Sequence, residues 1–112
     1  LKQPIELDLN DIRSDGDLSR FVIERVALAH SGEINVCYKR ALERKPTLEG
    51  KIVLDFTINA KGEVLNLQVQ PNAISDPTMI ECVTKAQGRW KYPKPKDNNE
   101  VHVSTPWSFY RN

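Results

Sequence analysis

The chain has 112 residues, the length of one ordinary domain, of which 39% are hydrophobic and 28% charged. These proportions are close to globular averages and exclude a disordered or fibrous chain. Lys and Arg number 16 and Asp and Glu 15, and the resulting formal net charge of +1 argues against a dedicated duplex-DNA binder.

Residues 1–16 are polar and acidic and show no sustained hydrophobic period. We interpret them as a linker or loosely docked arm that precedes one domain over residues 17–112. The chain starts at Leu1 rather than at Met, so we expect a processed chain or a piece of a longer protein. No apolar run approaches the ~18 residues of a membrane span.

A helical pattern extends from Leu18 to about Glu43. One stripe of residues recurs at steps of three and four, namely Ile23, Val26, His30, Ile34, Cys37 and Ala41. A glycine in a helix interior costs about 1 kcal/mol, so the pair Ser31–Gly32 predicts a kink or a break into two helices. Pro46 then ends the helix.

Two runs with a period of two come next. In Gly50–Asn59 every second residue is apolar, and in residues 62–70 Leu65, Leu67 and Val69 share one face. A short turn with Gly62 separates the two runs. This arrangement predicts two strands in an antiparallel hairpin.

A second helix is predicted after the hairpin. Asp76, or Ser75, is suited to its N-cap, and Pro77 to its first position. Met79, Cys82, Val83, Ala86 and Trp90 follow at helical spacing. Residues 90–100 are rich in Pro and Asn and are predicted to form a loop.

The last run, residues 100–110, alternates again and predicts a third strand. Pro106 cannot donate to a hydrogen-bond ladder, so we expect this strand at a sheet edge or with a bulge. The predicted fold class is α+β, with a three-stranded antiparallel-type sheet in the order 2-1-3. Each strand has one apolar face, so two helices should pack on one side of the sheet and leave the other side wet.

The order of several short motifs resembles the TonB-like C-terminal domains, particularly those of the AgmX/PglI type. The residues that carry the resemblance are His30, Cys37-Tyr38, Leu42 to Pro46, Leu48 to Gly50, Gly62, Cys82, Trp90-Lys91-Tyr92-Pro93-Lys94-Pro95 and Pro106-Trp107-Ser108-Phe109. Together these motifs extend from about Leu18 to Phe109, which is nearly the whole domain.

The resemblance implies a non-catalytic periplasmic domain of a protein anchored in the inner membrane. Such a domain would couple inner-membrane energy or motor machinery, in gliding motility or TonB-type transport, to outer-membrane proteins. Related domains serve nutrient uptake, motility and envelope integrity, so the resemblance does not identify the partner.

Cys37 and Cys82 lie on the inner stripes of the two predicted helices. An even cysteine count in a small domain, and the periplasm implied by the resemblance, favour one disulfide between them. The alternative is two free buried thiols that pack as small hydrophobic groups. With His30 and His102 the cysteines also make up the ligand inventory of a Cys2His2 zinc site, but no closely spaced ligand pair exists.

Other chemistry is weakly supported, and we expect no enzyme activity, cofactor or metal. His30 lies about 10 Å along the helix axis from Cys37, which is too far for a cysteine–histidine nucleophile unless the helix is broken. Residues 85–96 hold five cations, no acid and two aromatic residues, a pattern found on single-stranded nucleic-acid surfaces. A solvated loop with Trp90 and Tyr92 packed inward is the simpler interpretation.

The predicted edge strand offers a binding site for an extended peptide. Unpaired backbone groups on such an edge can accept a partner strand by β-augmentation. The proposed peptide-binding residues are Glu100, Val101, His102, Val103, Ser104 and Thr105, and the partner would be an outer-membrane or periplasmic protein. Two alternatives stay open: the arm 1–16 covers this edge, or the edge pairs with its own copy in a homodimer of an envelope scaffold.

Overall fold

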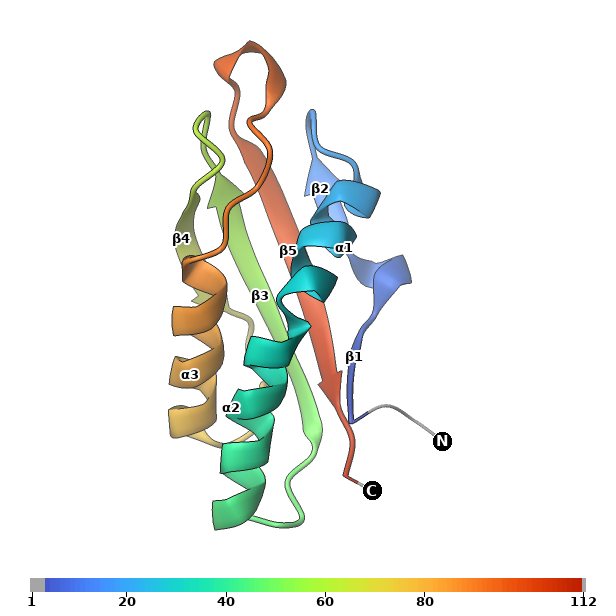
Figure 1. Ribbon diagram of the computed structural model, residues 1–112, viewed down its shortest axis with the longest axis vertical. Coiled ribbons are helices and arrows are strands. Elements are labelled where there is room, and N and C mark those ends of the chain that lie inside the picture. The colour runs from blue at the N-terminus through green and yellow to red at the C-terminus, as the bar shows by residue number, and fades with distance from the viewer. Residues whose placement is uncertain (1–3, 112) are drawn as a thin grey trace.

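The centre of the sheet is the predicted hairpin strand β3 (Gly50–Ile58), in a computed structural model that describes residues 4–111 (Figure 1). β3 pairs antiparallel with β4 (Val64–Val69) on one side and with β5 (Val101–Phe109) on the other. The predicted order of these three strands is therefore confirmed. The alternation places Ile52 and Leu54, both fully buried, on the face that packs against the helices.

Helices cover one face of the sheet: α1 (Arg20–Ala29), α2 (Ser31–Arg44) and α3 (Pro77–Gly88) (Figure 1). The predicted helix is broken in two, as expected, but the break falls at His30, whose φ of −107° and ψ of 8° end α1, and Ser31 and Gly32 are part of α2. α2 starts at the next residue. None of the helices within residues 4–111 has the length and apolar character that a membrane crossing requires.

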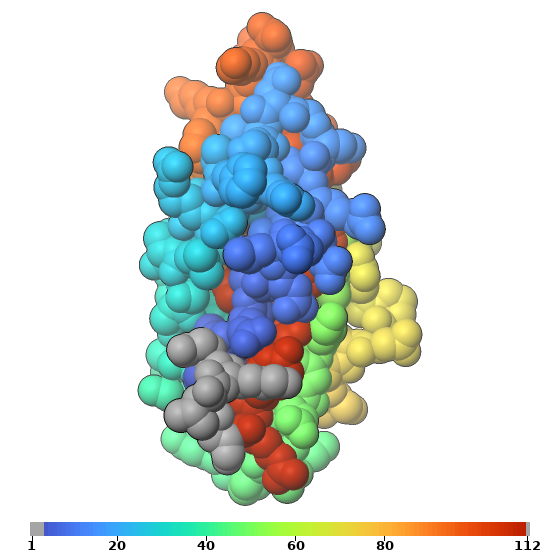
Figure 2. All heavy atoms as spheres, turned by 90° about the vertical axis from the view of Figure 1, so that its right-hand side faces the viewer, coloured from blue at the N-terminus to red at the C-terminus, as the bar shows by residue number. Residues whose placement is uncertain are grey.

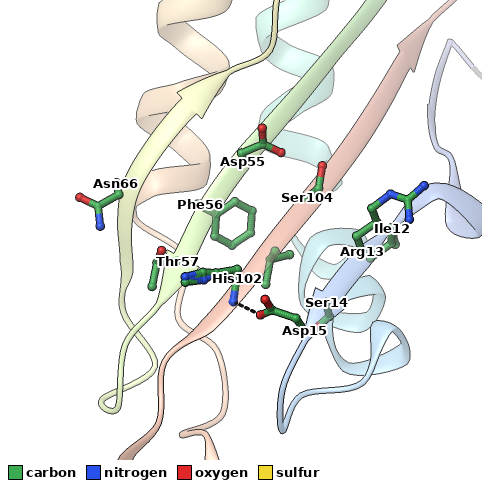
Figure 3. A pocket seen from close by; sticks show the side chains of 11 residues that line it. Ile12, Arg13, Ser14, Asp15, Asp55, Phe56, Thr57, Asn66, His102 and Ser104 are labelled. Carbon is green, nitrogen blue, oxygen red and sulfur yellow. Dashed lines mark hydrogen bonds between the residues drawn. The ribbon is translucent and has the colours of Figure 1, made fainter.

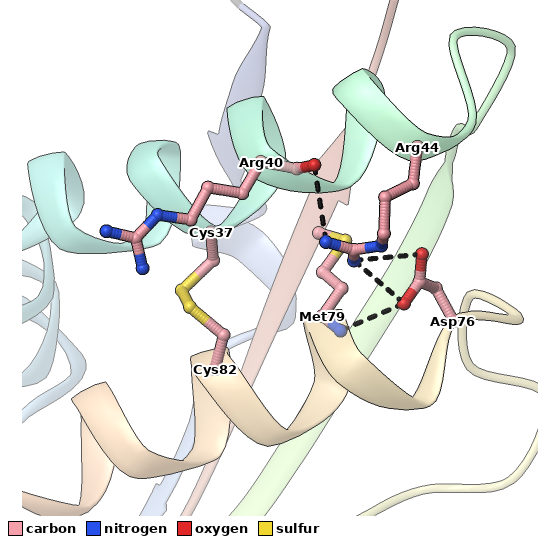
Figure 4. Close-up of polar contacts among 6 residues, drawn as sticks. All are labelled: Cys37, Arg40, Arg44, Asp76, Met79 and Cys82. Atoms are coloured by element: carbon pink, nitrogen blue, oxygen red, sulfur yellow. Dashed lines mark hydrogen bonds and ion pairs between the residues drawn. A yellow bond between two sulfur atoms is a disulfide. The ribbon is translucent and has the colours of Figure 1, made fainter.

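The N-terminus of α3 is capped as predicted. The Asp76 carboxylate accepts a hydrogen bond of 3.0 Å from the Met79 backbone N–H, and Pro77 occupies the first turn. The same carboxylate accepts two bonds, of 3.1 and 3.2 Å, from the Arg44 guanidinium at the end of α2 (Figure 4). The Met79 bond, followed by Arg44, holds the pKa of the Asp76 carboxyl below its ordinary value.

A buried polar network joins α3 to β5. Gln87 is fully buried; its amide nitrogen donates to the Thr105 hydroxyl at 2.6 Å and its amide oxygen accepts from the Trp107 indole N–H at 3.0 Å. Because buried polar groups are costly when unpaired, this network fixes how the helix sits on the strand.

The turn between β3 and β4 requires a glycine. Gly62 has a φ of +84°, and a Cβ at this position would overlap the Tyr92 carbonyl oxygen. The Tyr92 N–H donates to the Gly62 carbonyl at 2.9 Å, so the loop after α3 is tied to the hairpin turn. This loop includes a short 3₁₀ turn at Lys96–Asn98.

The arm differs from the prediction. It forms β1 (Ile5–Leu7), a 3₁₀ turn (Leu9–Asp11) and β2 (Arg13–Asp15), and both strands pair antiparallel with β5. The sheet thus has five strands rather than three, and β5 lies between β3 and the arm. Figure 2 shows the arm, in blue, lying over β5, in red.

Candidate peptide-binding site

The flank of β5 that faces away from β3 carries a regular row of backbone groups. The Pro106 carbonyl accepts from the Asp8 N–H at 3.0 Å, and the Tyr110 N–H donates to the Pro4 carbonyl at 2.8 Å. The His102 N–H points the same way and donates to the Asp15 carboxylate at 2.7 Å. Because strands alternate with a period of two, the backbone groups of residue 104 face this flank as well.

The expectation that this flank is open was wrong. β2 occupies it, with Arg13 opposite Ser104, Ser14 opposite Val103, and Asp15 opposite His102. Pro106 does lack a donor on this flank, but one missing donor does not exclude a partner strand. The Asp8 N–H donates to the Pro106 carbonyl, and the chain then leaves the flank in the 3₁₀ turn.

Five of the six predicted peptide-binding residues divide between two faces of the sheet. Val101, Val103 and Thr105 are buried on the helix side. His102 is exposed and Ser104 half-buried on the opposite face, and Glu100 is exposed and precedes the strand. On the open face, side chains of a bound peptide could therefore contact His102, Ser104 and their neighbours.

β1 is held firmly. Leu7 is 7% exposed and belongs to the hydrophobic core. The Asp8 carboxylate beside it accepts a bond of 2.8 Å from the Ser108 hydroxyl and lies 3.3 Å from the Lys51 ammonium. These contacts add side-chain burial and charge to the backbone pairing of β1.

β2 is held mainly by its backbone. The side chains of Arg13 and Asp15 are exposed, and that of Ser14, which is half-buried, donates to the Leu18 carbonyl at 2.5 Å. The buried apolar residues on either side of β2, Ile12 in the arm and Leu18 after it, lie outside the strand. β2 itself contributes no fully buried side chain.

A shallow groove lies beside β2 on the sheet face opposite the helices (Figure 3). Its volume is about 710 Å³, and β2, β3, β4 and β5 all line it. His102, Thr57 and Asp55 contribute to the lining, and the Asp55 carboxylate accepts bonds of 3.0 and 3.1 Å from the Gln70 amide. The groove could not be predicted from the sequence, because it depends on the pairing of β2 with β5.

The predicted disulfide is confirmed. Cys37 of α2 and Cys82 of α3 are bonded, with their Cα atoms 5.7 Å apart (Figure 4). Both sulfurs are therefore unavailable as metal ligands or nucleophiles in this state. Among residues 4–111, no three His, Cys, Asp or Glu side chains gather where they could hold a metal ion.

His30 has a structural environment. Its ring stacks on Trp90 with 5.0 Å between the centroids, and its Nδ1 lies 2.8 Å from the Glu33 carboxylate. The Trp90 indole N–H donates to the same carboxylate at 3.3 Å. Burial raises the pKa of Glu33, but these two bonds outweigh it and hold the pKa below its ordinary value.

The basic segment 85–96 is a solvated surface whose aromatic residues point inward, as the simpler interpretation predicted. Trp90 and Tyr92 are 2% and 5% exposed. Lys85 pairs with Glu81 on the same helix and Lys91 with Glu63. A stacking surface for nucleic-acid bases is therefore absent from this segment.

Comparisons with known proteins give one family match and two solved structures. Residues 40–110 match the family described as the Gram-negative bacterial TonB protein C-terminal. Among solved structures, the Helicobacter pylori TonB C-terminal domain superposes with a TM-score of 0.54 at 21% identity, over 85% of this chain and 87% of that chain. The Pseudomonas aeruginosa domain gives a TM-score of 0.46 at 16% identity, over 97% and 88%. No curated protein sequence matches this chain. Because the family match spans more than half of the sequence, the chain belongs to the family of Gram-negative bacterial TonB protein C-terminal domains.

Proposed function

We propose that this domain is a periplasmic adaptor that binds an extended peptide of an outer-membrane or envelope protein by β-augmentation. Domains of this family are non-catalytic interaction domains of the periplasm that contact outer-membrane proteins. In the proposal, a preceding inner-membrane segment links the domain to an energising or motor complex. The domain then transmits force to the bound partner, in transport or in gliding motility.

The pairing of the arm with β5 carries this proposal. The flank of β5 accepts an extended, antiparallel segment, whose partners include residues 102–104 of the predicted site. A guest peptide in the same place would form the same kind of backbone ladder, and backbone ladders supply affinity with little demand on sequence. The guest must take the place of β2, because β3 occupies the other side of β5.

Chemical-shift mapping tests the proposal. The ¹⁵N-labelled domain is titrated with synthetic peptides from extended segments of outer-membrane and envelope proteins of the same organism. We expect perturbations at the amides of His102 to Thr105 and in β2. Perturbations confined to β4, or none with any peptide, would remove the proposed site.

A pair of variants at one residue isolates the backbone contribution. Ser104→Pro removes the N–H that faces the flank, whereas Ser104→Ala keeps it and changes only the side chain. We expect the proline variant to bind at least tenfold more weakly than the alanine variant, because a lost backbone bond leaves the guest carbonyl unpaired.

The alternative function is self-association in an envelope scaffold. β4 ends the strand order of the sheet, so within residues 4–111 its outer flank carries no further strand. A homodimer would therefore pair through β4 rather than through β5. Its bulge near Asn66, where φ is +56°, works against such pairing. Sedimentation of a clean monomer would exclude this alternative.

A further inference from the structure

We propose that the two halves of the arm have different roles: β2 is an exchangeable internal strand that occupies the peptide site, and β1 is a permanent part of the sheet. A guest peptide displaces β2 alone and pairs with β5 beside the retained β1. This inference rests on the proposed function and adds how access to the site is controlled.

The contacts of the two strands differ in kind. β1 has a core side chain, Leu7, and is followed directly by Asp8, whose carboxylate has both a hydroxyl and an ammonium partner. Breaking these contacts would expose apolar surface and leave the buried Ser108 hydroxyl without its partner. β2 has exposed side chains at two of its three positions, so release of the strand exposes little apolar surface of its own while the flanking Ile12 and Leu18 stay docked.

Pro106 is the boundary between the halves. Its carbonyl accepts from Asp8, but it offers no N–H to continue the ladder, and the chain leaves the flank as a 3₁₀ turn at Leu9–Asp11. Pairing resumes only at Arg13 opposite Ser104. Because this turn separates the two ladders, β2 can detach without unzipping β1.

The bond at the far end of β2 is also of a kind that a guest can replace. The His102 N–H donates to the side-chain carboxylate of Asp15 rather than to a backbone carbonyl. A guest strand can offer a backbone carbonyl to the same donor. The exchange therefore replaces one acceptor with another and does not leave a buried donor unpaired.

The site defines the guest that fits it. The guest is a short extended segment that runs antiparallel to β5 and ends before Pro106. Opposite Val103 it needs a small side chain, since Ser14 is half-buried there toward the helix side. At the two neighbouring positions it can carry larger polar side chains, because these face the groove of about 710 Å³.

Hydrogen exchange of the native protein provides a first test that needs no variant. The amides of His102 and Ser104 face β2, and those of Asp8 and Tyr110 belong to the β1 ladder. We expect the first pair to exchange at least tenfold faster, because β2 opens locally while β1 stays docked. Equal protection of both pairs would overturn the inference.

A locked and a loosened variant provide the second test. Ser14 and Val103 are directly opposite each other in the antiparallel pair. Their Cα atoms belong to a closely spaced, non-hydrogen-bonded pair, which suits an engineered disulfide. The double variant Ser14→Cys with Val103→Cys therefore locks β2. Asp15→Ala removes the acceptor of the His102 N–H and loosens β2. Asp17→Ala, at an exposed position after the strand, is the matched control for the loss of charge.

The probe is a synthetic peptide of residues 10–18, which carries the pairing sequence of β2. Since apparent affinity scales with the open fraction, we expect Asp15→Ala to bind it about tenfold more tightly than Asp17→Ala, and the locked variant to show no binding. Intact mass must show two disulfides in the locked variant, and its β3 amide shifts must match the wild type.

Two results would overturn the inference: binding of the probe to the locked variant as tightly as to the wild type, and absence of binding to every variant. Neither result decides the proposed function, because this assay contains no envelope peptide. Envelope peptides that fail to bind even the loosened variant would overturn the proposed function instead.

Discussion

Removal of the Cys37–Cys82 disulfide, by alanine at both positions, is expected to lower the free energy of unfolding by about 4 kcal/mol. The bonded residues are 45 apart in sequence, and the ring that they close contains the whole β3–β4 hairpin. A ring of this length removes about 13 cal/mol/K of entropy from the unfolded chain, which is about 4 kcal/mol at 25 °C. Against a typical net stability of ~5–15 kcal/mol, this loss is large.

Urea unfolding followed by tryptophan fluorescence measures the effect. With a slope of about 1.5 kcal/mol per M, the midpoint of the double variant should lie about 2 to 3 M below that of the wild type. The wild type in dithiothreitol should show a similar shift. Val36→Ala, an exposed position beside the bond, is the control and should leave the midpoint nearly unchanged.

A loss below about 1 kcal/mol with an unchanged slope would refute the loop-entropy reasoning. It would mean that the unfolded chain without the bond already keeps α2 and α3 close together. A changed slope would locate the effect in the compactness of the unfolded state rather than in the entropy of closing the ring.

Three further predictions concern stability. Gly62→Ala should lower the free energy of unfolding by more than 1 kcal/mol in the same urea assay, because the residue has positive φ and a Cβ would meet a backbone carbonyl. The control is Gly88→Ala, where a Cβ meets nothing within 4 Å, and this variant should be neutral or stabilising. Asp76→Ala should cost about 1 kcal/mol at pH 7 through loss of the helix cap. The pKa of Asp76 is lowered in the folded state, so its contribution to stability is present above the unfolded pKa of about 4 and is lost as the pH falls toward the lower folded value. The free energy of unfolding of the variant should therefore fall less steeply with decreasing pH than that of the wild type. Gln87→Ala should cost about 2–4 kcal/mol in thermal or urea unfolding, since it leaves the Trp107 indole N–H buried without a partner, and a smaller loss would mean that water enters the site.

The sheet centre could be predicted from the sequence because a long periodic segment determines it, whereas the pair Ser31–Gly32 indicated the helix break only to within two residues. Gly50–Asn59 has enough alternating positions to set which face is buried, and the cap at Asp76 depends only on residues within the next turn. The disulfide was predicted because Cys37 and Cys82 lie on the inner stripes of the two predicted helices and because of the family resemblance. In each case the signal lies within one element or between two neighbouring ones.

The arm could not be predicted in the same way. β1 and β2 have three residues each, too few for a period to stand out among polar neighbours. Their stability depends on partners far away in the chain, since Asp15 bonds a residue 87 positions later and Asp8 one 100 positions later. Among the described residues of the arm, the apolar side chains of Ile5, Leu7 and Ile12, which pack in or against the core, are a local indication that the arm docks.

The docked arm protects the flank of β5 but also competes with any guest peptide. An unpaired flank of β5 would be a template for aggregation, and the arm covers it. However, a strand tethered by a short linker competes at an effective concentration of about millimolar, so a guest peptide must overcome this competition. β2, with no fully buried side chain, keeps that competition weak. A guest whose side chains fill the groove at His102 would gain contacts that Arg13 and Asp15, both still exposed in the docked arm, do not fully provide. Selectivity for partners should therefore come from the groove face rather than from the backbone ladder, which any extended peptide can form.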